Sequence, residues 1–281
     1  FESIKFWEHL AAKHDFEFAQ RGSLIVAHPQ DRHMLDRFAQ HIPNPKRMDV
    51  QGVETLEPSL AGRFREGLYL ADEAHLHPQK AMMALLSRIE NKHAHAFDIK
   101  SAEYDFIIDC RGLAAQDSDL RGVKGELLVV HNPDFTLTRP VRLMHPRYAL
   151  YIVPRAGNMF MIGATQIEAE GEALPSVKSA MELMSALVTL HPSFAESAIL
   201  TITADMRPSY PDNLPRIRRA GNVISCNGLF RHGFLLSPVM AACVLALVEG
   251  REVPYISYFM EGAEHERSEE RRVGKECRSR W

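Results

Sequence analysis

The run of residues 125–165 constrains the fold of this chain more than any other segment. Its apolar pieces ELLVVH, YIVPR and NMFMIGAT are separated by proline, glycine and asparagine, which favour turns. The last two pieces are joined by so short a connection that they fit an antiparallel pair, because parallel strands need a longer crossover. We therefore expect a largely antiparallel sheet in the middle of the chain.

Helical and extended patterns alternate on both sides of this run, which predicts a mixed α/β fold. Apolar residues recur at helical spacing over residues 3–13, 31–38 and 79–89, and after Pro175 and Ser176. Short apolar runs predict strands at 23–27, 67–70, 106–110 and 199–202, and the third is expected to be covered on both faces. The expected buried side chains are Met82, Leu85, Leu86 and Ile89 in the third helix, and Val177, Met181, Met184, Leu187 and Val188 in the fourth.

Residues 267–281, RSEERRVGKECRSRW, show no apolar periodicity and resemble a translated sequencing adapter. We set this tail aside as an artefact; the alternative is a genuine basic tail that binds nucleic acid. The tail carries six basic and three acidic residues, which leaves 27 basic and 33 acidic residues and a net charge of −6. That charge does not favour a nucleic acid or an anionic membrane as partner.

The composition of the whole chain, with 46% hydrophobic and 25% charged residues, is typical of a globular protein. No apolar run is long enough to span a bilayer, and no signal peptide is visible. Cys110, Cys226 and Cys243 are far apart in the sequence, show no C-x-x-C spacing and sit in apolar runs. We expect them to be buried, reduced thiols, and we expect the protein to be cytoplasmic.

Fourteen histidines raise the question of a metal site. The pairs His75/His77 and His93/His95 have a spacing that places both rings on one face of a strand. A metal site also needs a third and a fourth ligand with supporting partners, and no H-x-x-x-H or C-x-x-C completes one. We therefore expect no metal.

An arginine before a proline and a glycine-bracketed turn mark the region 206–238. Arg207 precedes Pro208, so its backbone should be extended, and its guanidinium could bind a carboxylate through two parallel hydrogen bonds. The alternative for Arg207 is a surface salt bridge. Gly228 and Gly233 bracket four residues whose backbone could approach a ligand closely.

A helix is expected to follow this turn. Ser237 is a candidate N-cap, Pro238 a candidate first helical residue and Gly250 the residue that ends the helix. The N-terminus of such a helix favours negative charge on a ligand.

These residues resemble the C-terminal part of the FAD-dependent amino-acid oxidases, and most closely the glycine oxidases of thiamine biosynthesis. The resemblance runs over residues 1–262. In that family the arginine of an RP segment holds the substrate carboxylate, which implies this role for Arg207, and Arg231 is expected to face the substrate as well. The segment IIDCRG and the turn after Asn227 resemble the parts beside the flavin. The resemblance thus implies FAD contacts for Gly112, Gly228, Leu229, Phe230, Arg231, His232, Gly233, Phe234 and Leu235.

Two further substrate contacts are implied by the same resemblance. Tyr151, which begins YIVPR, matches an aromatic hydroxyl that helps to hold the substrate carboxylate. Gln166, which follows the IGAT run, matches a residue that limits the room beside the alpha carbon. The alternative for Tyr151 is an amphipathic core tyrosine with its hydroxyl at the sheet edge.

The family has a Rossmann-type FAD domain with an inserted antiparallel substrate domain. By resemblance, residues 1–20, 78–120 and 207–262 would form a partial FAD domain, and 21–77 with 121–206 the substrate domain. Such flavoproteins begin with a strand, a G-x-G-x-x-G loop and a helix that holds the pyrophosphate. No G-x-G-x-x-G occurs in this chain, and we expect it to lie upstream of Phe1. No adenine-contacting residue is assigned between Glu90 and Tyr104, where relatives have a longer segment.

The implied reaction is the oxidative deamination of glycine or a small D-amino acid, by hydride transfer from the alpha carbon to FAD. The imino acid would feed thiazole formation in thiamine biosynthesis, and oxygen or another acceptor would reoxidise the cofactor. One alternative is an FAD-dependent dehydrogenase for D-amino acids or sarcosine-type substrates. A second is an inactive fragment, truncated at its N-terminus and unable to hold FAD. Relatives are often homo-oligomers, and self-association is open for this chain.

Overall fold

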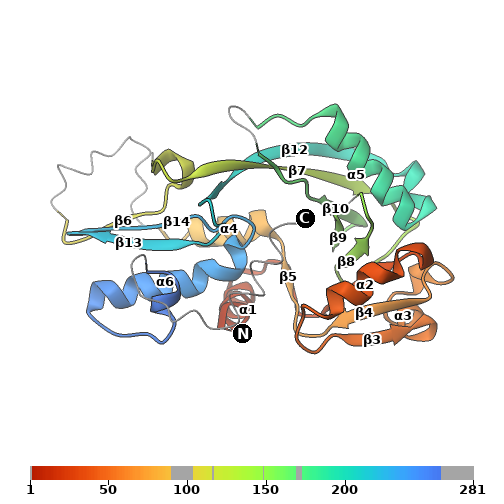
Figure 1. Ribbon diagram of the computed structural model, residues 1–281, viewed down its shortest axis with the longest axis horizontal. Helices are drawn as coiled ribbons and strands as arrows, with labels where there is room; N and C mark the ends of the chain where they lie inside the picture. Colours follow the sequence, from red (N-terminus) through yellow and green to blue (C-terminus); the bar gives the residue numbers. More distant parts are fainter. Residues whose placement is uncertain (1, 90–103, 116, 148, 169–172, 261–281) are drawn as a thin grey trace.

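The computed structural model describes residues 2–89, 104–115, 117–147, 149–168 and 173–260. These residues form a large sheet with helices on one side of the molecule and a smaller sheet with helices on the other (Figure 1). The α-helices are α1 (Glu2–His14), α2 (Arg32–Ala39), α3 (Val50–Leu56), α4 (Pro78–Leu86), α5 (Val177–Leu190) and α6 (Gly233–Glu249). The His93/His95 pair and residues 267–281 lie outside the described residues.

Strands from most of the chain contribute to the sheets. They are β1 (Phe18–Ala19), β2 (Ser23–Ala27), β3 (Lys46–Asp49), β4 (Glu66–Leu70), β5 (His75–Leu76), β6 (Ile107–Asp109), β7 (Arg121–His131), β8 (Val141–Met144), β9 (Ala149–Arg155), β10 (Met159–Gly163), β11 (Ile167–Glu168), β12 (Ala198–Ser209), β13 (Arg216–Ala220) and β14 (Val223–Asn227).

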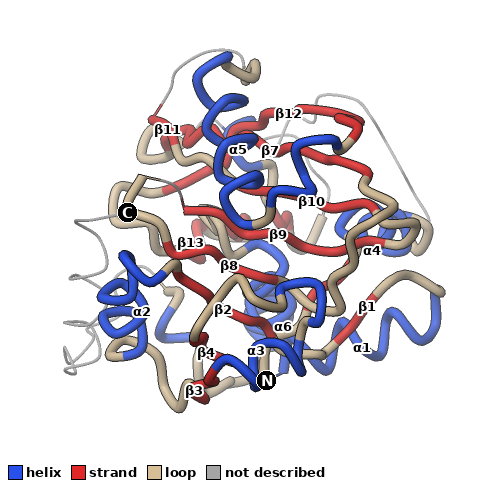
Figure 2. Tube along the Cα trace, turned by 90° about the vertical axis from the view of Figure 1, so that its right-hand side faces the viewer, coloured by secondary structure: helices blue, strands red, loops and turns tan. Residues whose placement is uncertain are grey.

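The large sheet has the strand order β11-β7-β10-β9-β8-β2-β4-β3, with β12 on the other edge of β7. Figure 2 shows these strands one above another, with α5 lying across them. Its pairs are antiparallel except β2 with β8. The antiparallel sheet expected over residues 125–165 is confirmed, and so are the strands expected at 23–27, 67–70 and 199–202.

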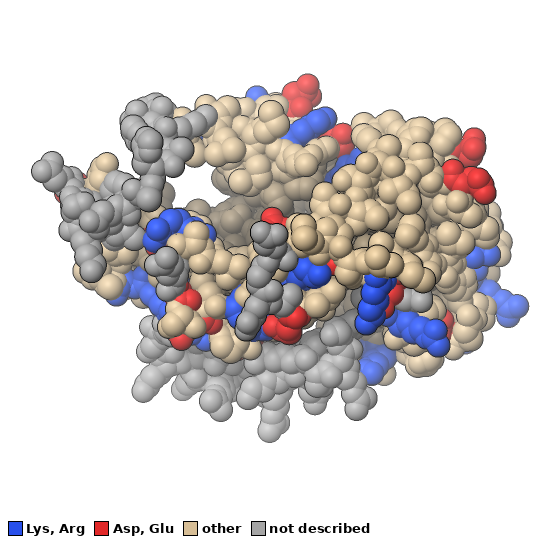
Figure 3. Space-filling model, turned by 90° about the horizontal axis from the view of Figure 1, so that it is seen from above, with Lys and Arg blue, Asp and Glu red and all other residues tan. Residues whose placement is uncertain are grey.

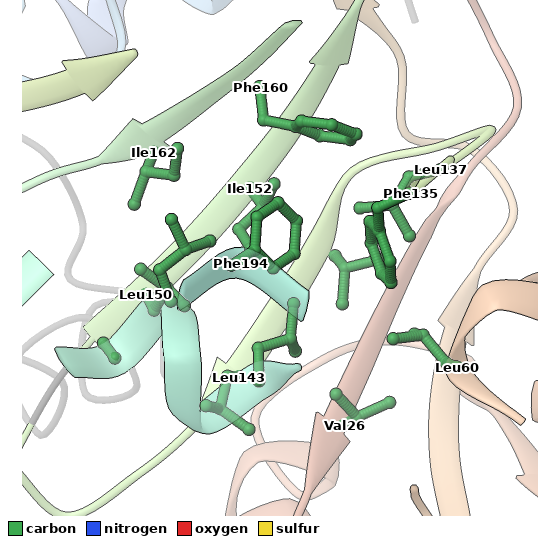
Figure 4. Packing of buried hydrophobic residues seen from close by; sticks show 14 of the residues in the cluster. Val26, Leu60, Phe135, Leu137, Leu143, Leu150, Ile152, Phe160, Ile162 and Phe194 are labelled. Carbon is green, nitrogen blue, oxygen red and sulfur yellow. The ribbon is translucent and has the colours of Figure 1, made fainter. Parts of the chain in front are cut away.

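One face of the large sheet carries the main core. Phe135, Phe160 and Phe194 meet there, with ring centroids 4.6 to 5.9 Å apart, and aliphatic side chains from β2, β8, β9 and β10 surround them (Figure 4). Side chains alternate between the two faces of a strand, so neighbours of these core residues point to the opposite face. That opposite face carries the candidate site described below.

Helix α5 covers the core face, with a stripe only partly the expected one. Leu187 is buried and Met184 packs against the core as expected, but Val177 and Met181 are 79% and 61% exposed. Leu183, Ala186 and Leu190 are buried in their place. Both stripes have helical spacing, so periodicity alone could not choose between them. The helix begins as expected, because the Ser176 side chain accepts a hydrogen bond from the Ser179 N–H.

The small sheet has the order β13-β14-β6, in which β14 and β6 run parallel. Helix α6 packs its apolar side chains on this sheet around the buried Ile217, Ile224 and Met240. Strand β6 was expected to be covered on both faces, and this was wrong, because Ile108 is 42% exposed. Ile107 and Asp109, on the opposite face of the strand from Ile108, are half-buried and buried, so the apolar run reflected one covered face rather than two.

Helix α6 begins one turn earlier than expected. Its first residue is Gly233, and Pro238 lies inside the helix; Ser237 is therefore not its N-cap. A proline at this position cannot donate to the carbonyl of residue 234. The indole N–H of Trp7 donates to that Phe234 carbonyl instead, at 2.6 Å. The end of α6 was predicted correctly, because Gly250 adopts the left-handed conformation with φ 66°.

Helices α1 and α4 pack together beside the small sheet (Figure 1). Of the side chains expected to be buried here, Leu85 packs against the α1–α4 cluster. Met82, Leu86 and Ile89 are exposed instead, and Ala81 and Ala84 are buried. Alanine lets two helices approach closely, so the larger side chains flank the contact. The short pair β1–β5 connects this region to the large sheet.

Of the three cysteines discussed above, only Cys243 is buried; Cys110 is exposed and Cys226 is half-buried. The expectation of buried thiols was therefore wrong for Cys110. Within the part of the chain that the structure describes, no helix is both long and apolar enough to cross a membrane.

Candidate functional site

Arg207 lies on the large sheet with its guanidinium folded flat over a glycine of the neighbouring strand. A Cβ atom at Gly125 would overlap the guanidinium, so only glycine leaves it room. Its Nη1 donates to the Thr165 carbonyl at 3.1 Å. Among the described residues no carboxylate forms an ion pair with Arg207.

The electrostatic surroundings of Arg207 favour an anion. Burial lowers the pKa of its guanidinium, the nearby Tyr151 and Asp205 oppose this, and the cation of Arg231 lowers it further. A half-buried guanidinium beside a second cation is stabilised by negative charge placed between them. The structure thus brings Arg207, Tyr151 and Arg231 into one region.

Tyr151 lies across a second glycine on the same face of the sheet. It pairs with Gly163 in the register of β9 with β10, and a Cβ at residue 163 would lie 2.6 Å from the Tyr151 hydroxyl oxygen. The ring therefore rests on the backbone of β10, and Tyr151 is half-buried. Its placement beside Arg207 leaves the hydroxyl able to contact the same ligand.

A buried carboxylate supports the Thr165 segment from below. Glu126 is fully buried; it accepts hydrogen bonds from the Thr165 hydroxyl and the Ser176 N–H and pairs with Lys124 at 2.9 Å. Burial alone would raise the pKa of Glu126, but hydrogen bonds from Ser179 and Lys124 hold it below its usual range. A charged Glu126 thus fixes the loop whose carbonyl orients Arg207.

Backbone contacts join the Arg207–Pro208 segment to the turn that follows β14. The Phe230 N–H donates to the Pro208 carbonyl at 3.1 Å. Gly228 has φ 77°, and a Cβ there would overlap the ring of Tyr210. Because the left-handed conformation and the close ring both require glycine, the turn has a fixed path beside Pro208.

The turn after β6 meets the same region. Gly112 has φ 62°; its carbonyl accepts from the Asn227 side chain at 3.0 Å, and a Cβ there would lie 3.5 Å from Pro208. Strands β6 and β14 are parallel, and ligands of α/β sheets bind beyond the carboxyl ends of parallel strands. The two glycine turns therefore lie where such a ligand is expected.

The N-terminus of α6 directly follows the Gly228 turn. A Cβ added at Gly233 would have no atom within 4 Å, so the space beside the first turn is open. The first N–H groups of a helix have no partner within it and carry positive charge. The anionic edge of a flavin or a phosphate fits these residues, and the earlier start of α6 makes Gly233 the residue at this end.

The other expected contact residues occupy the rim of the site. Arg231, His232 and Leu235 are exposed, and Phe234 lies at the same rim with its ring centroid 5.5 Å from that of Trp7. Leu229 instead packs into the α6 core. Gln166 directly follows Thr165 and is exposed, so the structure places it next to the Arg207 contact without burying it.

Sequence reasoning missed the residues that shape the site from beneath: Gly125, Gly163, Thr165, Glu126 and Tyr210. A glycine inside a strand pattern signals a close approach of another group, and this signal was present at Gly125 and Gly163. The contacts of Glu126 and Tyr210 come from distant segments and leave no local pattern.

The histidine pair His75/His77 has structural partners. Arg155 Nη1 lies 3.2 Å from His75 Nδ1, and His77 Nδ1 accepts from the Lys80 N–H at the start of α4. Within the described residues, no group of three or more histidine, cysteine, aspartate or glutamate side chains could hold a metal ion.

On the face seen in Figure 3, basic and acidic side chains are interspersed.

Comparisons with known proteins agree with this arrangement. Residues 1–247 match the family described as FAD dependent oxidoreductase, DAO. The chain is 42% identical over 228 residues to a thiamine biosynthesis oxidoreductase, ThiO, of Rhizobium etli, which covers 79% of the chain and 70% of that protein. It is 31% identical over 134 residues to glycine oxidase of Bacillus subtilis, covering 47% of the chain and 35% of that protein.

A solved structure shares the fold. Glycine oxidase from Geobacillus kaustophilus superposes with a TM-score of 0.78 at 19% identity, over 93% of this chain and 81% of that one. Fold, matched family and glycine turns together define an oxidoreductase that uses FAD as its cofactor. The chain belongs to the DAO family of FAD dependent oxidoreductases.

Proposed function

We propose that this enzyme oxidises glycine or a small D-amino acid to the imino acid, and that the product supplies thiazole formation in thiamine biosynthesis. The observation that carries the proposal is the Arg207 guanidinium, half-buried over Gly125 with Tyr151 and Arg231 nearby. Such a site fits one carboxylate. The relatives named ThiO and glycine oxidase support the substrate and the pathway.

The side chains of this site act by binding and orientation. Arg207 and Tyr151 would hold the carboxylate, which fixes the amino acid in one orientation on the sheet. Bound FAD supplies the acceptor for the hydride that leaves the alpha carbon. Gln166 is proposed to border the alpha carbon, and holding the reactants in place in this way accounts for a large part of such catalysis.

The cofactor contacts are proposed from the turns on the two parallel strands. Gly112 and residues 228–235 would lie along the flavin, with the N-terminus of α6 near its negatively charged edge. The separate small and large sheets support a division into an FAD domain of residues 1–20, 78–120 and 207–262 and a substrate domain of 21–77 and 121–206. Oxygen or another electron acceptor and a cytoplasmic location stay predictions, and self-association stays open.

The test begins with the chain itself. FAD is titrated into the purified protein and followed by flavin fluorescence, and hydrogen peroxide is then measured with glycine, D-alanine and sarcosine. For a form of the protein that also carries the G-x-G-x-x-G segment, we expect FAD binding and peroxide formation with glycine. Arg207→Ala should lower kcat/KM on the order of 100-fold, because a charged carboxylate loses its partner, and Tyr151→Phe should cost less.

A control separates binding from folding. Arg207→Lys keeps the charge but not the planar fork, so it should recover only part of the loss while its thermal unfolding stays unchanged. Near-normal turnover of glycine by Arg207→Ala would refute the assignment. Turnover that requires an artificial acceptor would indicate a dehydrogenase, and failure to bind FAD would indicate that the chain alone is inactive.

A further inference from the structure

Cys110 and Cys226 lie side by side where two parallel strands end. In the register of β6 with β14, Ser225 is opposite Asp109, the last residue of β6. Cys226 and Cys110 directly follow these two residues along the chain. Neighbouring strands lie roughly 4.8 Å apart, within the range of about 4.4 to 6.8 Å that a disulfide needs between Cα atoms. Neither thiol is in a disulfide, and each shifts the pKa of the other.

The two cysteines differ in exposure and in charge state. Cys110 is exposed, whereas Cys226 is half-buried against the α6 core. The hydrogen bond from the Cys226 thiol lowers the pKa of Cys110, although burial and Asp109 oppose this. The same contact, followed by burial, raises the pKa of Cys226. Cys110 is therefore the thiol with the lower pKa and the greater exposure.

The pair also lies directly beneath the proposed cofactor turns. Cys110 precedes Arg111 and Gly112, and Cys226 precedes Asn227, whose side chain donates to the Gly112 carbonyl. Neither cysteine has a part in the proposed amino-acid chemistry. An exposed thiol that ionises readily, with a second thiol in contact, is the arrangement that oxidants convert to a disulfide.

We propose that Cys110 and Cys226 form a dithiol site that hydrogen peroxide oxidises to a reversible disulfide. The Cys110 sulfur attacks peroxide, an S–O bond forms as the O–O bond breaks, and one water leaves. The Cys226 sulfur then attacks that sulfur, the S–S bond forms, and the oxygen departs as a second water. Two thiols are oxidised and one peroxide is reduced, so the step needs no further reactant. A dithiol such as dithiothreitol reverses it.

The experiment maps the cysteines of the full chain after exposure to hydrogen peroxide. Cys277→Ser is used as background, so that only three cysteines remain. Remaining thiols are blocked with an alkylating reagent, and unreduced peptides are analysed by mass spectrometry. We expect a peptide pair joining Cys110 to Cys226, lighter by two hydrogens than the separate peptides and lost after dithiothreitol. Cys243, which is buried, should remain alkylatable after unfolding.

Single substitutions test the assigned order of the two thiols. Cys110→Ser should slow the loss of the Cys226 thiol at least about tenfold, because the exposed nucleophile is gone. Cys226→Ser should leave Cys110 with added oxygen atoms and no link. Cys243→Ala is the matched control, and its linking rate should equal that of the background protein within about twofold.

Three results would overturn the proposal. One is that both thiols stay alkylatable under peroxide that oxidises a free cysteine peptide in the same tube. Another is a link from Cys226 to Cys243, which also lies close enough to raise the pKa of Cys226. The third is a link between two chains through Cys110. Each of these results is measured on the protein that keeps both Cys110 and Cys226, so the conclusion does not depend on how the single variants fold.

Discussion

Arg207 can adopt its observed position only because residue 125 has no Cβ atom. We predict that Gly125→Ala lowers kcat/KM for glycine on the order of 100-fold, because a displacement of about 1 Å at a positioning group has that effect. The backbone itself should tolerate the change, since alanine in a strand is favoured over glycine by about 0.5–1 kcal/mol. Steady-state kinetics and thermal unfolding measured together distinguish the two effects.

A double-mutant cycle isolates this contact at the residue scale. In an Arg207→Ala background the overlap with the guanidinium is absent, so adding Gly125→Ala should change kcat/KM less than about twofold. Equal losses in both backgrounds would mean that residue 125 acts through the strand and not through Arg207. Lowered thermal stability of Gly125→Ala alone would point the same way.

At the scale of elements, the start of α6 depends on a side chain from the other end of the chain. Pro238 leaves the Phe234 carbonyl without its helical partner, and the Trp7 indole supplies a hydrogen bond at 2.6 Å. We predict that Trp7→Phe lowers the free energy of unfolding by about 1.5 kcal/mol, the upper end of the net contribution of one hydrogen bond, because this contact is part-buried. Urea unfolding followed by far-UV circular dichroism measures it.

The companion substitution for this contact is Pro238→Ala, which restores an N–H that can reach the same carbonyl. In that background Trp7→Phe should cost at least about 1 kcal/mol less than in the native sequence. If the cost is the same in both, the indole contributes by packing against Phe234 and not through the hydrogen bond.

The same helix shows where prediction from sequence ends. Gly250 and Ser176 carry local capping chemistry, and the structure confirms both. Pro238 was expected to be a first helical residue, because the sequence could not show that Trp7, 227 positions away, compensates for it. The exposed stripe of α5 has the same cause, since two apolar stripes are present and only the position of the sheet chooses between them.

The candidate site was predictable to a similar degree. The RP segment and the glycine-bracketed turn have local signatures, and the structure brings them together through Phe230 and Pro208. The contact of Arg207 with Gly125 and the position of the buried Glu126 depend on strands β7 and β12 pairing in one particular register. Pairing between distant segments has no signature in either segment alone, so these residues emerged only from the structure.

At the scale of the whole molecule, residues 75 and 155 connect the region around α1 to the site face of the large sheet. Arg155 ends β9 on the same face as Tyr151, and its Nη1 lies 3.2 Å from Nδ1 of His75 in β5. Burial is the main cause that lowers the pKa of His75 to about 4; Arg155 and Arg21 add to it, and Glu17 opposes it. His75 therefore accepts the Arg155 hydrogen bond as a neutral ring.

This contact predicts a specific loss of stability in acid. The unfolded chain binds a proton at His75 near pH 6.5, whereas the folded chain does so only near pH 4. The folded state is therefore at full stability above pH 6.5, and the free energy of unfolding falls as the pH drops from 6.5 towards 4. Solvent screening of this half-buried ring limits the loss to about 1–2 kcal/mol. His75→Gln keeps an acceptor for Arg155 but cannot titrate, so its unfolding free energy should fall less over that window. Urea unfolding at pH 8 gives the fixed cost of the substitution, and parallel curves for the two proteins between pH 6.5 and 4 would contradict the assignment.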